Sequence, residues 1–187
     1  MIVLGLGGLF LLIGCCGLFT WAGISSSEQQ QEFSPLAAAC DGRAVEGTAT
    51  HPAPDTRAVV MERRSSGDWH FDTLLTPRAY QPETRAETSL VVCMEEPREV
   101  TIERCEFIES MWGVDVDDMS LPRTQQQAPA RLVEAATGRV LVTGEIHGAT
   151  PSCDDWSGDE PSESDFEGED IEADDIHAWL VQQLPSG

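Results

Sequence analysis

The stretch ARLVEAATGRVLVTGEI, residues 130–146, contains two apolar runs separated by a short turn. The first run covers residues 130–135 and the second covers residues 139–146. Both runs are rich in residues that favour strands, and turn 136–138 ends in a glycine where a three-residue hairpin loop needs a left-handed residue. This stretch therefore predicts a β-hairpin.

Four further segments predict strands because they combine apolar and β-branched residues between turn signals. They are residues 57–62, 69–74, 89–94 and 100–107. The last two flank residues 95–99, which predicts a second hairpin. No amphipathic helix of ordinary length interrupts the strands, and this argues against parallel βαβ units. We expect a mainly β fold, a small antiparallel β-sandwich or open barrel, within residues 39–150.

Four cysteines lie outside the apolar N-terminus: Cys40, Cys93, Cys105 and Cys153. An even number in an exported domain predicts two disulfides. Their wide spacing disfavours zinc, which is usually held by close pairs. We expect Cys93–Cys105 within the second hairpin and Cys40–Cys153 across the domain. The alternative is Cys40–Cys93 with Cys105–Cys153.

Residues 1–24 form an apolar run without a charged side chain. About twenty apolar residues suffice to cross a bilayer, so we expect a single-pass transmembrane helix with the bulk of the chain extracytoplasmic. Two alternatives stay open. A signal peptide could be cleaved after the small residues Gly23 and Ser25, or Cys15 could be lipidated as in a bacterial lipoprotein. Residues 25–38 are then a polar linker.

The chain carries 33 acidic residues and 11 basic ones, and its formal net charge is −22. All of the basic residues are Arg. Such a surface repels nucleic-acid phosphates, so a nucleic-acid partner is excluded. The membrane, through residues 1–24, and other envelope proteins are the expected partners.

Residues 151–173 predict an acidic, low-complexity loop, because twelve Asp or Glu fall within residues 154–175. Part of this stretch is spaced like an EF-hand loop and offers weak calcium candidates. These candidates are Glu163, Asp165, Glu167 and Asp174.

Residues 174–187 predict a C-terminal helix. Asp174 or Asp175 can cap it, and apolar residues recur at helical spacing before Pro185. Ile176, Trp179, Leu180 and Leu184 make this stripe, which we expect to pack on the β-domain.

Motifs for catalysis or cofactor binding are absent from the sequence: there is no nucleophile elbow, phosphate loop or dinucleotide fingerprint. His147 lies six residues before Cys153, but we expect that cysteine in a disulfide. We therefore expect no catalytic residues, no cofactor and no resident metal, and a non-catalytic binding or structural module of the cell envelope. The alternatives are an envelope enzyme that uses carboxylates or His147, and an acidic cation-binding module.

Overall fold

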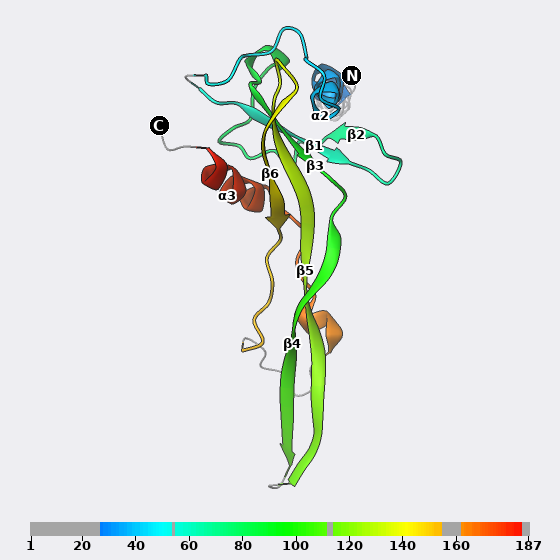
Figure 1. Cartoon of the computed structure of the whole chain (residues 1–187). Coiled ribbons are helices and arrows are strands. Elements are labelled where there is room, and N and C mark those ends of the chain that lie inside the picture. Colours follow the sequence, from blue (N-terminus) through cyan, green and yellow to red (C-terminus); the bar gives the residue numbers. More distant parts are fainter. Residues whose placement is uncertain (1–26, 54, 112–113, 155–161, 185–187) are drawn as a thin grey trace, which may run out of the picture.

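The computed structural model describes residues 27–53, 55–111, 114–154 and 162–184. Their strands form one six-stranded sheet, in the order β2-β1-β3-β5-β4 with β6 also paired to β5 (Figure 1). The fold is mainly β with a C-terminal helix, as the sequence predicts. The elements in chain order are η1 (Ser34–Leu36), α2 (Ala37–Cys40), β1 (Ala58–Arg63), β2 (Trp69–Phe71), η2 (Arg85–Glu87), β3 (Leu90–Met94), β4 (Arg98–Met111), β5 (Val114–Glu134), β6 (Arg139–His147), η3 (Glu163–Phe166) and α3 (Ala173–Gln183).

The hairpin predicted from residues 130–146 is confirmed. Strand β5 pairs antiparallel with β6, and Glu134 lies opposite Arg139 at the turn. Gly138 has a φ of 70°, in the left-handed region that glycine adopts without steric cost.

The expected antiparallel sandwich or barrel is wrong, because β1 and β3 pair in parallel within a single sheet. The crossover between them carries β2 and the short helix η2 in place of a crossover helix. All of β3 and the first four residues of β1 are apolar and buried, as is typical of strands that are covered on both faces.

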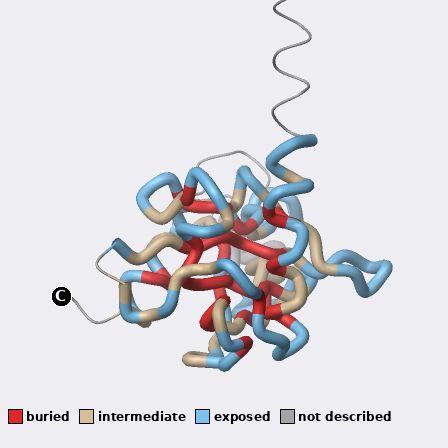
Figure 2. Tube along the Cα trace, turned by 90° about the horizontal axis from the view of Figure 1, so that it is seen from above, coloured by how far each residue is buried: buried red, intermediate tan, exposed pale blue. Residues whose placement is uncertain are grey.

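Within the part of the chain that the structure describes, each face of the sheet is covered by helical segments and not by a second sheet. Residues alternate along β1, so that Val60 packs on the α3 side with Ile176 and Leu180, whereas Val59 packs on the opposite side with Leu36. The buried residues form the centre of the molecule in Figure 2, with exposed loops around them. The sheet is therefore the middle of three layers.

The N-terminal side of the core comes from residues expected to form a polar linker. Residues 27–33 are helical and lead into η1 and α2. Phe33 and Leu36 are only 2% and 0% exposed, and the rings of Phe33 and Phe71 lie 4.7 Å apart. Phe33 and Leu36, one helical turn apart, dock this segment together with the small residues Ala39 and Cys40, and so few apolar residues are too weak a pattern to predict a helix.

The C-terminal helix predicted from the apolar stripe is confirmed as α3, and Ile176, Trp179 and Leu180 are buried against the sheet. The expected cap is corrected: Glu172 is the N-cap, and Asp175 lies in the first turn, where its carboxylate accepts a hydrogen bond from the backbone N–H of Glu172 at 2.9 Å.

The hairpin expected between residues 89–94 and 100–107 is wrong. Strands β3 and β4 do not pair with each other; they follow one another along the same edge of β5. Met94 lies opposite Ala130, and Arg98 lies opposite Gln127. The loop 95–97 is therefore an interruption within one long strand and not a hairpin turn.

Strands β4 and β5 extend beyond the three-layered body as a long two-stranded ribbon (Figure 1). We call the described residues 98–111 and 114–127 the arm. Within the described sheet β4 pairs with β5 alone, and β5 gains β6 as a partner only from Gln127 onwards. The arm is thus a continuation of the central strand of the core.

The disulfides follow the alternative pairing and not the preferred one. Cys40 is bonded to Cys93, and Cys105 is bonded to Cys153. Cys93 cannot face Cys105 because their strands lie end to end. The first bond ties α2 to β3 inside the core, and the second ties β4 of the arm to the chain after β6.

No helix within the described residues is long and apolar enough to cross a bilayer. The transmembrane segment expected at residues 1–24, with Cys15, lies outside the described residues.

A substitution at Gly138 tests whether the β5–β6 turn packs closely against residues 42–43. A Cβ atom there would lie 2.6 Å from the carbonyl carbon of Gly42, in addition to the strain of a positive φ. We expect Gly138→Ala to lower the free energy of unfolding by about 3 kcal/mol. Gly67→Ala is the matched control, because Gly67 also has a positive φ but open space around it, and it should cost about 1 kcal/mol. Denaturant unfolding measures both, and equal losses would contradict the close packing of the turn against residues 42–43.

Candidate functional site

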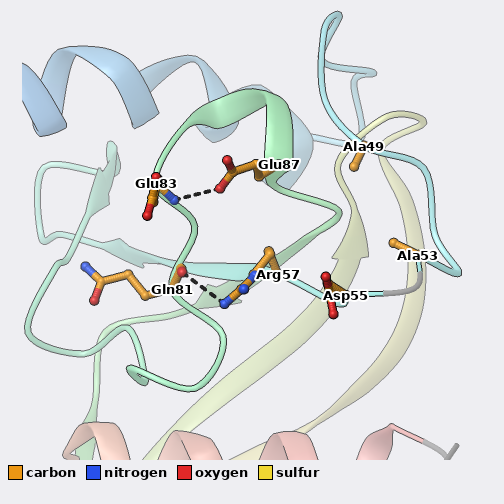
Figure 3. A pocket seen from close by; sticks show the side chains of 7 residues that line it. All are labelled: Ala49, Ala53, Asp55, Arg57, Gln81, Glu83 and Glu87. Atoms are coloured by element: carbon orange, nitrogen blue, oxygen red, sulfur yellow. Dashed lines mark hydrogen bonds between the residues drawn. The ribbon is translucent and has the colours of Figure 1, made fainter.

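A pocket of about 540 Å³ opens between the segment before β1 and the loop before β3 (Figure 3). We call it the Arg57 pocket. Two alanines form part of its wall, and the remaining side chains are polar or charged. It is lined by Ala49, Ala53, Asp55, Arg57, Gln81, Glu83 and Glu87.

The parallel pairing of β1 and β3 builds this pocket. Because Ala58 lies opposite Leu90, the residues that precede these strands, Arg57 and Ser89, also lie next to each other. The backbone N–H of Arg57 donates to Oγ of Ser89 at 3.3 Å, and the Arg57 carbonyl accepts the N–H groups of Ser89 and Leu90. Ser89 is fully buried. The backbone of Arg57 is therefore held independently of its side chain.

The side chains of Arg57 and Glu87 bond to backbone groups of the pocket and not to each other. Nη1 of Arg57 donates a long hydrogen bond of 3.5 Å to the carbonyl oxygen of Gln81. The carboxylate of Glu87 accepts the backbone N–H of Glu83 at 2.9 Å, and Figure 3 shows both bonds. Among the described residues no carboxylate lies within ion-pairing distance of Arg57.

A second pocket, of about 560 Å³, lies between residues 73–81 and the start of α3. Leu74 is 87% exposed at its rim, and Asp174 and His177 line the α3 side. The rings of His177 and Tyr80 lie 5.6 Å apart. Asp174 is the one calcium candidate in this pocket.

The other calcium candidates lie apart from Asp174, on and just after η3. The carboxylate of Asp165 accepts two hydrogen bonds from Ser162, from its N–H at 2.8 Å and its hydroxyl at 2.9 Å. These bonds lower the pKa of Asp165 and commit the carboxylate to capping. Glu163 belongs to η3, and Glu167 follows it. In the described part of the chain no three His, Cys, Asp or Glu side chains gather as a metal site would require.

His147 lies at the end of β6, where its Nδ1 is 3.0 Å from Oε1 of Gln125. The neighbouring cysteine that could have paired with it, Cys153, is in a disulfide. Among the described residues, His147 therefore lies against an amide and not against a nucleophile or a carboxylate.

Glu134 is a buried carboxylate, 5% exposed, at the end of β5. The hydroxyl of Thr137 donates to it at 2.6 Å and the N–H of His51 at 3.2 Å, and Arg139 lies at 3.4 Å. The Thr137 bond is the main cause of the lowered pKa of Glu134, and burial opposes it. These partners close the β5–β6 turn, so the group has a structural role.

A strap, which we define as residues 148–154 and 162–172, lies along the base of the arm. The N–H of Gly148 donates to the carbonyl of Gln126, and the N–H of Gly168 donates to Oγ1 of Thr124. A Cβ on Gly168 would lie 2.6 Å from Cα of Gln125, so this close approach requires glycine. The strap therefore gives the arm a third element at its base.

Ionic and covalent links fasten the strap further. Arg123 pairs with Glu103 across the arm at 2.7 Å and donates to the carbonyl of Pro151 at 3.0 Å. The Cys105–Cys153 disulfide lies beside this ion pair. A two-stranded ribbon is marginal in water by itself, so these links stabilise the arm.

The residues of the Arg57 pocket were not singled out by the sequence. Asp55 and Arg57 are about thirty residues from Glu83 and Glu87, and only the parallel strand pairing joins them. With 33 acidic residues in the chain, no carboxylate stands out.

Comparisons of the chain with models of known protein families, with curated proteins and with solved structures found no significant match.

The two disulfides differ in exposure, which predicts an order of reduction. Cys40 and Cys93 are both buried in the core, whereas Cys153 is partly exposed beside the arm. A thiolate must reach a sulfur atom to attack it, so limiting dithiol should reduce Cys105–Cys153 at least roughly tenfold faster in the native protein. Peptide mass mapping after thiol alkylation measures this. In denaturant the two rates should converge, and native reduction of Cys40–Cys93 first would contradict the burial argument.

Proposed function

We propose that the protein is a membrane-anchored, extracytoplasmic β-domain that acts as a non-catalytic binding module of the cell envelope. The apolar run 1–24 supports the anchor, and two disulfides support an oxidising compartment. The domain would stand outside the membrane and meet its partner there.

The observation that carries the proposal is the arm. Fourteen residues of β4 and the matching part of β5 extend from the body, and β4 has no other strand partner within the described sheet. Open strand edges are a template for contact with another protein. The strap and the Cys105–Cys153 disulfide hold the base of the arm in place, which lowers the entropy lost on binding.

Charge defines the kind of partner. Residues 98–127 contain seven acidic side chains and three Arg, within a chain of net charge −22. An envelope protein that presents a basic surface would be attracted to this arm, whereas nucleic acid and anionic lipid would be repelled.

Site-specific photocrosslinking in intact cells tests this proposal. A photoreactive residue at Ile102, which is 37% exposed on the arm, should give a discrete adduct with an envelope protein. The same residue at Val181 on α3, which is 52% exposed, is the matched control and should give none. Glu99→Arg, a charge reversal at an exposed position of β4, should lower the Ile102 adduct yield about tenfold.

Equal adducts at positions 102 and 181, or none at 102, would contradict a role for the arm. An Ile102 adduct that is insensitive to Glu99→Arg would contradict the basic partner.

A further inference from the structure

Beyond the role of the arm, we propose that the Arg57 pocket binds a free basic α-amino acid, a ligand with one carboxylate and two cationic groups. The juxtaposition that points to it is one guanidinium and three carboxylates around a single cavity of about 540 Å³ (Figure 3). A cavity of this volume is in the range that small-molecule ligands occupy.

The guanidinium supplies the contact for the ligand's carboxylate. Arg57 is partly buried, and its one described side-chain hydrogen bond, to the Gln81 carbonyl, is long at 3.5 Å. Arg offers five N–H donors in a planar fork that matches a carboxylate in two parallel bonds. Most of those donors are free to turn to a ligand, because no ion pair holds Arg57 in the described part of the chain.

The carboxylates supply the contacts for the ligand's cations. Glu87 is held by the N–H of Glu83, and this leaves acceptor capacity on its carboxylate. The side chains of Asp55 and Glu83 accept no hydrogen bond from any described residue. The α-ammonium and the side-chain cation of the ligand can therefore each pair with a carboxylate of the pocket.

The charge balance separates this ligand class from others. The three carboxylates and one guanidinium give the lining a formal charge of −2. A basic amino acid, with a net charge of +1, is attracted to it, whereas phosphates and dicarboxylates are repelled. A polyamine would be attracted to the carboxylates, but its cationic groups would be repelled by the guanidinium of Arg57. The alanine walls at Ala49 and Ala53 leave room for a methylene chain.

The carboxylates are exposed, so the binding is weak and depends on salt. We expect a dissociation constant on the order of 1 mM for L-lysine at low ionic strength.

Isothermal titration of the full-length protein with L-lysine tests the proposal. Cadaverine, which lacks the carboxylate, and Nα-acetyl-L-lysine, which lacks the α-ammonium, should each bind at least roughly tenfold more weakly. L-glutamate should give no heat of binding. Arg57→Gln should abolish L-lysine binding, and Glu83→Gln should weaken it about threefold.

Arg78→Gln is the matched control, because Arg78 lines the second pocket, and it should leave L-lysine binding unchanged. Arg57→Gln should fold normally, since the backbone of Arg57, and not its side chain, makes the buried contacts with Ser89. An unchanged unfolding midpoint verifies this.

No binding of L-lysine, equal binding of cadaverine, or full binding by Arg57→Gln would overturn the proposal. If Nα-acetyl-L-lysine binds as tightly as L-lysine, the α-ammonium is not recognised. The proposal of a free amino acid would then be wrong, and the ligand would be the C-terminal basic residue of a peptide. The pocket and the arm are tested separately, because Glu99→Arg should not change the titration.

Discussion

Strand β5 is the element on which the rest of the structure depends. Its 21 residues pair first with β4 in the arm and then, from Gln127 to Glu134, with β6 on one edge and mostly β3 on the other. The strand is therefore the centre of the core sheet and one side of the arm at once. A strand cannot shift its register by one residue without turning its buried face to solvent. The buried half of β5 thus fixes the register in which the arm begins, and the pairing of β4 with β5 then shifts twice, between Thr101 and Glu103 and between Ile108 and Ser110.

The two disulfides secure the two ends of this arrangement. Cys40–Cys93 joins the N-terminal helical segment to the sheet, where all five residues of β3 are buried. Cys105–Cys153 joins the arm to the strap, beside the Arg123–Glu103 ion pair. The first link supports a core that is already well packed. The second supports a two-stranded ribbon whose described side chains are mostly exposed or half-buried, so this disulfide matters more for the direction in which the arm extends.

The features that the sequence predicts correctly are local ones. The β5–β6 hairpin depends on a turn with Gly138 and two adjacent apolar runs, and α3 depends on a stripe of apolar residues at helical spacing. The strand pairings that fail are non-local. Apolar strands such as β1 and β3 pair equally well with several partners, and sequence alone does not rank them. The cysteine pairing failed for the same reason, because it was inferred from a β3–β4 hairpin that does not form.

The candidate site could be predicted even less well. Arg57 falls at the start of a predicted strand, but its neighbours in the pocket come from residues 81–87, and the parallel register that joins them was not foreseen. The calcium candidates show the opposite error, in which the sequence suggests a site that the described residues do not form. Glu163, Asp165 and Asp174 have suggestive spacing, yet Asp165 caps η3 and Asp174 lies at the start of α3. Spacing along the chain predicts a site only where one local element holds all of its residues.

The most direct test of this account is amide hydrogen exchange along β5 in the native protein. If the arm continues the core, the amides of residues 120–127 that are hydrogen-bonded to β4 should open together with the hydrogen-bonded amides of residues 128–134, with protection factors within about tenfold of each other. If residues 120–127 exchange at the rate of an unfolded peptide while residues 128–134 stay protected, the arm is not held by the core, and the central claim is wrong.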